Sequence, residues 1–251
     1  MAQDEGSTLL RLLEIVEAVS VGDRPRNPTE INDQLGYPKA TIHRLCSVLE
    51  REGWLQRELD GKRLSPGRRL YRMALGVLSS EQHRAHRHTV LVRLSRLIGE
   101  TCNISIPDGS QMRYIDRVET HWPLRMQLPI GSRVPLYCTA AGKTYLASFP
   151  KSRRRSLIAG LELQPRVAKT LTTPDALEAE LEKTAERGYG LDDEEFVEGM
   201  VCVAVPIYND SKQLFATLSF HAPTSRMSLQ EALQFVPQMQ EAARELADPE
   251  Q

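Results

Sequence analysis

The chain has 251 residues, a net charge of −1 at pH 7 and 41% hydrophobic residues, which suffices for one large domain or, as we expect, for two domains that each bury a core. Its N-terminal residues are polar and no apolar run approaches the roughly 18 residues that a membrane span needs, so we expect a cytoplasmic protein without a secretory or membrane segment. Cys46, Cys102, Cys138 and Cys202 show neither disulfide nor zinc spacing and are expected to be buried thiols.

The first predicted element is a helix that begins at Ser7 or Thr8 and ends near Ser20 and Gly22. Its apolar residues follow the 3.6-residue period of a helix with one buried face. They are Leu9, Leu12, Leu13, Val16 and Val19.

The next segment, Asn27 to Leu64, has the outline of a winged helix-turn-helix. Asn27 can cap a helix, Pro28 suits its first position, and Glu30 completes a capping box. Gly36 then ends this short helix, and Pro38 starts a second one that runs to about Glu52. Ile42, Leu45 and Leu49 are its expected buried stripe.

The other face of the second helix carries small, hydrogen-bonding and cationic side chains. Such side chains reach base edges and phosphates when a recognition helix enters a major groove. The predicted DNA contacts on this helix are Lys39, Ala40, Thr41, His43, Arg44, Ser47 and Arg51.

A hairpin follows, with strands Trp54 to Arg57 and Lys62 to Leu64 around the turn dipeptide Asp60-Gly61. It is the expected wing, and from Lys39 to Arg72 the chain has nine Lys or Arg against four Asp or Glu. The alternative is a solvated helical face beside an ordinary hairpin, but the caps, turn and wing occur in the order that a DNA-binding unit requires. The predicted backbone contacts are Lys62, Arg63, Arg68 and Arg69.

Ser65-Pro66-Gly67 is interpreted as a break before a connecting helix from Arg68 to Leu78, and Ser79-Ser80 as a domain boundary. The connecting helix has one apolar stripe, made of Leu70, Met73, Ala74 and Val77.

The pattern of residues 81–251 predicts an α+β domain with an antiparallel sheet that is able to enclose a small-molecule cavity. The expected strands are Cys102 to Ile106, Met112 to Glu119, Leu124 to Leu128, Met200 to Tyr208 and Gln213 to Phe220. The expected helices are Glu81 to Gly99, Thr139 to Ala147, Ser152 to Leu161, Pro174 to Arg187 and Leu229 to Leu246. The first of these helices should bury Val90, Leu91, Leu94, Leu97 and Ile98, and its His83, His86 and His88 indicate a polar helix start rather than a metal site.

Two runs in this half carry a family resemblance. Pro135 to Ala147, which includes Thr139-Ala140-Ala141-Gly142-Lys143-Thr144, and Arg187 to Pro206, which includes Gly190-Leu191-Asp192-Asp193-Glu194-Glu195, resemble the effector-domain signatures of IclR-type transcriptional regulators. The winged helix with Pro38 and Arg44 is similar to the DNA-binding domain of that family.

The resemblance implies a ligand-responsive transcriptional regulator that binds double-stranded operator DNA as a homodimer or homotetramer. It implies a GAF-like domain that binds a small organic effector, and many members control catabolism of carboxylic or aromatic acids. The implied organisation is a winged helix-turn-helix over residues 1–67, a connector helix over 68–80 and an effector-binding and oligomerisation domain over 81–251. The implied pocket residues are Val134, Ala140, Ala141, Asp192, Cys202, Ser219 and His221.

Two positions depart from the family pattern. Thr139-Ala140-Ala141 has one glycine fewer than is usual, and His221 stands where a small polar residue is common. Amides at the start of the helix near Ala140 still suit a carboxylate, which favours an anionic effector.

Several residues also have simpler interpretations. The carboxylates of residues 192–195 are typical of a cluster that is solvated or caps a helix, and Gly142-Lys143-Thr144 lacks the glycine-rich loop of a nucleotide site. Cys202 is also compatible with a buried core position, and His221 with the exposed end of a strand. We therefore expect no catalytic residues, no cofactor and no metal. The alternative function is a small-molecule-processing enzyme with an accessory winged-helix interaction domain.

Overall fold

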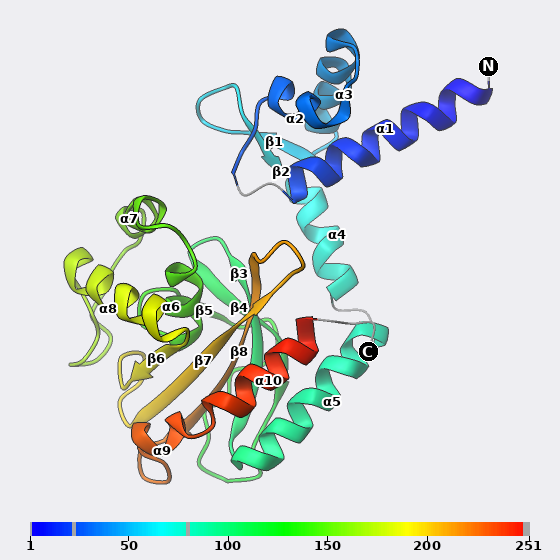
Figure 1. Ribbon diagram of the computed structural model, residues 1–251. Coiled ribbons are helices and arrows are strands. Elements are labelled where there is room, and N and C mark those ends of the chain that lie inside the picture. The colour runs from blue at the N-terminus through cyan, green and yellow to red at the C-terminus, as the bar shows by residue number, and fades with distance from the viewer. Residues whose placement is uncertain (1, 22–23, 79–80, 248–251) are drawn as a thin grey trace. The chain divides into compact units, whose positions relative to one another are not determined.

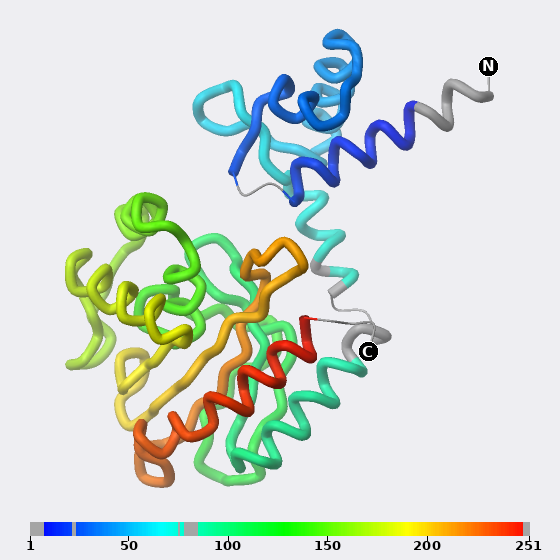
Figure 2. The backbone as a smooth tube through the Cα atoms, viewed as in Figure 1, coloured from blue at the N-terminus to red at the C-terminus, as the bar shows by residue number. Residues whose placement is uncertain are grey.

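The computed structural model describes residues 2–21, 24–78 and 81–247 (Figure 2). The chain divides into two units, Met1–Ser80 and Glu81–Gln251. The expected boundary at Ser79-Ser80 and the expected helix end at Gly22 lie outside the described residues. None of the described helices combines the length and the apolar character that crossing a membrane requires.

The N-terminal unit consists of helices around a small core, with a two-stranded antiparallel sheet at its end (Figure 1). Its core joins Ile15 of the first helix to Ile42 and Leu45 of the third and to Leu55 and Leu64 of the sheet. The elements are α1 (Ala2–Ser20), α2 (Pro28–Leu35), α3 (Lys39–Arg51), β1 (Leu55–Arg57), β2 (Leu64–Pro66) and α4 (Arg68–Leu78).

The predicted helix-turn-helix is confirmed. The Asn27 side chain accepts the amides of Thr29 and Glu30, and the Glu30 carboxylate accepts the Asn27 amide, so the capping box is complete. Gly36 ends α2 with φ +70°, a left-handed conformation that glycine adopts without strain. α1 begins at Ala2, earlier than the cap expected at Ser7 or Thr8.

The predicted wing is wrong in detail. β1 pairs Leu55 with Pro66 and Arg57 with Leu64, so the loop spans residues 58–63, and Ser65 and Pro66 lie in β2 instead of forming a break. The reason is local, because the Asp60 carboxylate accepts the amides of Lys62 and Arg63 and holds both residues in a turn.

The connector helix α4 is confirmed, but its apolar stripe is not buried within the chain. Leu70 is buried, whereas the Met73 and Val77 side chains are 50% and 52% exposed. Three leucines of α1, Leu9, Leu10 and Leu13, are exposed to a similar degree.

The C-terminal unit is a six-stranded sheet of order β5-β4-β3-β8-β7-β6, in which all neighbours pair antiparallel, as the sequence predicts. Its strands are β3 (Thr101–Asp108), β4 (Gln111–Val118), β5 (Arg133–Pro135), β6 (Gly190–Asp193), β7 (Met200–Tyr208) and β8 (Leu214–Pro223). Its helices are α5 (Glu81–Ile98), α6 (Ala140–Ala147), α7 (Lys151–Ala159), α8 (Pro174–Arg187), α9 (Leu229–Leu233) and α10 (Val236–Ala247).

Helices cover both faces of this sheet (Figure 1). α6 packs on one face, with α8 and α7 outside it, while α5 and α10 lie side by side across the other face. The core between α6 and the sheet contains Met112, Tyr114, Val134 and Ala204, with the Cys202 side chain packed against it. The face under α6 is called the α6 face below.

The structure differs from the sequence expectations at several points in this unit. Leu124 to Leu128 is a loop between Pro123 and Pro129, held by hydrogen bonds from Arg226 and Arg117 to its carbonyls. β5 and the short β6 were not expected as strands, and the last helix divides into α9 and α10. Leu97, expected in the core, is 57% exposed.

Two glycines let α6 lie very close to its neighbours. A Cβ atom on Gly142 would stand 2.3 Å from the Leu136 carbonyl oxygen, and one on Gly190 would stand 2.3 Å from the Ala140 carbonyl oxygen. No side chain fits at either position, so the α6 N-terminus is fixed against β6 and the preceding segment.

A β-bulge changes which residues of β4 share the α6 face. The register pairs Ile104 with Asp116 but Ser105 with Tyr114, which leaves Ile115 as an extra residue. Tyr114 and Arg117 therefore both face α6 although they are three positions apart.

Candidate DNA-binding and effector sites

The outer surface of α3 carries the side chains that the sequence predicts for DNA contact. Lys39, Ala40, His43, Arg44, Ser47 and Arg51 are exposed and Thr41 is half-buried. Lys39 and Arg44 contact no carboxylate among the described residues, so their charges are available to a partner. Ser47 donates its hydroxyl to the His43 carbonyl oxygen at 3.0 Å.

The cations of the wing and of α4 divide into two groups. Lys62 and Arg68 are exposed and contact no carboxylate in the described part of the chain. Arg63 pairs with Asp60, and Arg69 lies 3.9 Å from Glu52 and over the Trp54 ring at 4.6 Å. The bound Lys62 and Arg63 amides hold the pKa of Asp60 below its usual range, so its carboxylate keeps the turn in place.

Asn32 fixes the turn before α3 and is not among the residues predicted from the sequence. Asn32 donates its side-chain amide to the Tyr37 carbonyl oxygen at 2.7 Å and accepts the Tyr37 amide at 2.8 Å. Both bonds span five residues and hold the angle between α2 and α3. An asparagine inside the first helix of a short helix pair was the available signal.

In the C-terminal unit, strand pairing brings the implied pocket residues onto the α6 face. Cys202 lies between Asp192 and His221 on neighbouring strands, and Ser219 lies between Ala204 and Asn103. Ala140 and Ala141 belong to the core cluster that covers this face, as does Val134 from β5. The structure thus brings all seven residues to one side of the sheet.

The acidic run of residues 192–195, which begins at the end of β6, is held by specific partners. Asp192 accepts the amides of Glu195 and Phe196, and burial raises its pKa to about 7. Lys143 is completely buried, forms an ion pair with Glu195 and lies 3.9 Å from Glu180. Because Lys143 is paired inside the protein, it is not placed to bind a phosphate.

A second buried cluster on the α6 face was not predicted. Arg117 donates to the Asn103 side-chain oxygen at 2.7 Å, to Glu119 at 3.2 Å and to the Met126 carbonyl oxygen. The Asn103 side-chain nitrogen lies 3.3 Å from His221 Nδ1. These residues come from three strands, so only the pairing register reveals the cluster.

The histidines at the start of α5 form no metal centre with other residues of the described part of the chain. His88 instead places Nδ1 3.1 Å from Asp116, on the face opposite α6. The His83 side chain lies outside the described residues.

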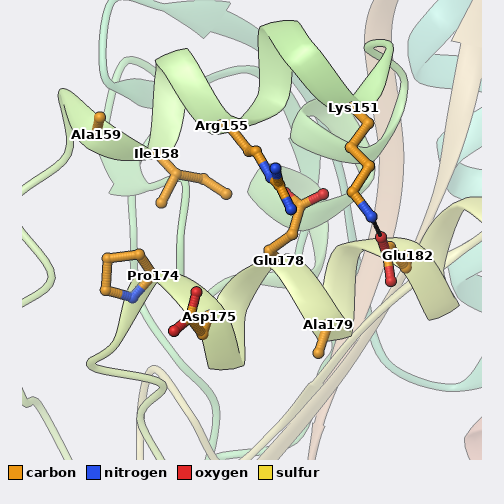
Figure 3. A pocket seen from close by; sticks show the side chains of 9 residues that line it. All are labelled: Lys151, Arg155, Ile158, Ala159, Pro174, Asp175, Glu178, Ala179 and Glu182. Carbon is orange, nitrogen blue, oxygen red and sulfur yellow. Dashed lines mark hydrogen bonds and ion pairs between the residues drawn. The ribbon is translucent and has the colours of Figure 1, made fainter.

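A groove of about 570 Å³ lies between α7 and α8, away from the predicted effector residues. Figure 3 shows Lys151 and Arg155 on one helix facing Asp175, Glu178 and Glu182 on the other. Lys151 pairs with Glu182 across it, so the groove is bordered by charges of both signs that partly compensate each other.

Two domain models of one protein family match most of this chain. The model of the IclR helix-turn-helix domain matches residues 8–59, and that of the bacterial transcriptional regulator IclR C-terminal domain matches residues 75–248. The chain is 37% identical over 246 residues to a protein of Cupriavidus necator described as "Probable transcriptional regulator SauR", with 98% of each chain covered.

The fold also agrees with that of solved structures from this family. The crystal structure of Thermotoga maritima IclR superposes with a TM-score of 0.64 at 30% identity, covering 96% of this chain and 97% of that one. An IclR homologue from Microbacterium hydrocarbonoxydans, crystallised with 4-hydroxybenzoate, has the same fold with a TM-score of 0.59 at 22% identity, covering 96% and 97%. These relatives are regulators and not enzymes, which removes the enzyme alternative; the chain belongs to the IclR family of bacterial transcriptional regulators.

Proposed function

We propose that this regulator binds a specific operator through α3 and the wing, and that a small organic acid bound on the α6 face changes its operator affinity. The observation that carries the proposal is the exposed face of α3, where Lys39 and Arg44 have no carboxylate partner among the described residues. An uncompensated cation beside small side chains suits a major groove, since phosphates and guanine edges supply the missing anions and acceptors.

Within this proposal, α3 reads bases and the flanking cations position it. Arg44 contributes a bidentate base contact, while Lys62, Arg63, Arg68 and Arg69 contact phosphates. The proposed domain boundaries are those predicted from the sequence. Residues 1–67 bind DNA, residues 68–80 connect the two domains, and residues 81–251 bind the effector and oligomerise. Because the partner is chromosomal DNA, the protein acts in the cytoplasm.

We also propose that it acts as a homodimer or a pair of homodimers. Two copies of α3 then enter successive major grooves about 34 Å apart. The exposed apolar residues of α1 and α4, Leu9, Leu13, Met73 and Val77, support this because a second copy would remove them from water.

The effector class follows from the α6 face and from the family. The N-terminus of α6 presents Ala140 and Ala141 beside Cys202, and helix amides favour a carboxylate. The Microbacterium homologue, which was crystallised with 4-hydroxybenzoate, supports an acid.

A DNA shift assay tests the proposal. Promoter DNA that adjoins the gene should be bound by the wild type, and Arg44→Ala should weaken this binding by roughly 1 to 3 kcal/mol without unfolding the protein. Arg96→Ala, on an exposed position of α5, is the matched control and should bind like the wild type. Equal affinity of a folded Arg44→Ala variant would contradict the assigned DNA face.

A further inference from the structure

The buried cluster of Arg117, Asn103 and His221 has a fixed direction of hydrogen bonding. A guanidinium only donates, so the atom of Asn103 that lies 2.7 Å from Arg117 must be its oxygen. This places the side-chain nitrogen of Asn103 toward His221 Nδ1, at 3.3 Å. That nitrogen also only donates, and His221 Nδ1 must therefore accept.

The direction at Nδ1 settles where the His221 proton lies. A neutral imidazole that accepts at Nδ1 carries its hydrogen on Nε2. Burial lowers the pKa of His221 to about 3 and the Arg117 charge acts in the same direction, while Glu119 opposes both. His221 is thus neutral at physiological pH and its Nε2 is a donor.

This donor is buried and unmatched. His221 is 5% exposed, and its Nε2 has no hydrogen-bond partner among the described residues. A buried donor that lacks an acceptor destabilises a fold, so this position favours a bound acceptor. The strand register puts His221 beside Cys202 on the α6 face, where the candidate effector residues converge.

The surrounding charge favours a negatively charged acceptor. Arg117 and Arg125 both contact one carboxylate, that of Glu119. Two guanidinium groups beside one carboxylate leave a positive surplus, which a bound anion compensates.

We propose that His221 donates from Nε2 to a carboxylate oxygen of the effector, with Asn103 and Arg117 as positioning residues that hold the ring in this tautomer. This inference rests on the proposed function and deepens it, because it names the side chain that recognises the acid group and the tautomer that this recognition requires. A hydrogen bond to a carboxylate is stronger than one to a neutral carbonyl, so His221 then favours acids over their neutral amides.

The tautomer is measurable on the intact protein without an effector. In protein labelled with ¹⁵N-histidine, long-range ¹H–¹⁵N spectra should show an unprotonated Nδ1 and a protonated Nε2 for His221. Asn103→Leu should remove this preference, while the His88 signals stay unchanged and serve as an internal control. A protonated Nδ1 in the wild type would overturn the proposal.

Ligand recognition is tested with named probes: benzoate, 4-hydroxybenzoate and succinate, each beside its neutral amide. At least one acid should shift the His221 Nε2–H signal, and its amide should do so much less. His221→Phe should weaken binding of that acid by about ten- to a hundredfold, and His221→Gln, which keeps a donor, should restore part of it. If no acid moves the His221 signal, or if an acid shifts the Ala140 amide but not His221, the proposal fails.

Operator binding distinguishes this failure from failure of the proposed function. An acid that changes the operator affinity of the wild type and of His221→Phe equally would refute the role of His221 but keep the regulator. Absence of any operator binding would refute the proposed function while leaving the tautomer measurement valid.

Discussion

On α3 most of the candidate contact residues are exposed and Lys39 and Arg44 have no carboxylate partner in the described chain, whereas Lys143 and Arg117 of the C-terminal unit, the proposed effector unit, are buried and paired. The charges on α3 are therefore available to a large external partner, as we propose for operator DNA. The buried charges of the effector unit instead stabilise one another inside the protein. Substitutions of these charged residues should therefore affect binding in the N-terminal unit and stability in the C-terminal unit.

The largest effect is expected where α6 meets the preceding backbone. Gly142→Val would place side-chain atoms inside the Leu136 backbone, and should lower the free energy of unfolding of the C-terminal unit by about 4 kcal/mol or more. Urea unfolding followed by circular dichroism measures it. Gly76→Ala is the control, because nothing lies within 4 Å and α4 should gain up to about 1 kcal/mol.

The second effect concerns the buried lysine. Lys143→Met leaves the Glu195 carboxylate buried without its cation, and we expect a loss of about 3 to 5 kcal/mol in unfolding free energy. The double variant Lys143→Met with Glu195→Gln should recover at least half of it. A single variant as stable as the wild type would show that this pair is not needed for the unit.

The pH dependence of stability should report Asp192. Burial raises its pKa from 3.8 to about 7, so the protonated form stabilises the fold fully at acid pH and that contribution disappears as the pH rises through about 7. Asp192→Asn keeps an acceptor for the Glu195 amide but does not ionise. Between about pH 5 and about pH 8, wild-type stability should fall by roughly 2 to 3 kcal/mol relative to this variant. If the stability of the wild type and of Asp192→Asn changed in parallel with pH, the pKa of Asp192 would lie near its ordinary value.

A smaller effect is expected at the turn before α3. Asn32→Ala removes two hydrogen bonds to Tyr37 and should destabilise the N-terminal unit by about 1 to 2 kcal/mol, with a parallel loss of operator affinity. Gln34→Ala, an exposed position on the same helix, should change neither quantity. If Asn32→Ala binds the operator normally, the turn does not depend on this residue.

The smallest effect belongs to the wing. Lys62→Ala should weaken binding to all DNA sequences by a similar few-fold factor and reduce the slope of log affinity against log salt by about 1. Lys183→Ala, exposed on α8 of the effector unit, should leave that slope unchanged. Loss of sequence preference in Lys62→Ala would show that Lys62 reads bases.

The difference between local and long-range contacts explains which elements the sequence predicts well. Caps, breakers and helical stripes are local, so α2, α3, α4 and α8 were correctly placed from Asn27, Gly36, Pro174 and their neighbours. The wing loop was misplaced because the Asp60 side chain decides it. The Arg117 cluster was missed because its members meet only through strand pairing, which no local pattern encodes.

The bulge at Ile115 has a consequence for how such regulators diversify. If β4 were regular over these residues, Tyr114 and Arg117 would point to opposite sides of the sheet, and the α6 face would lose one of them. A shift of the bulge along β4 would thus exchange an aromatic wall for a charged one without altering any pocket residue. Ligand preference in this fold can therefore change through the position of a bulge, an evolutionary route that comparison of aligned pocket positions would overlook.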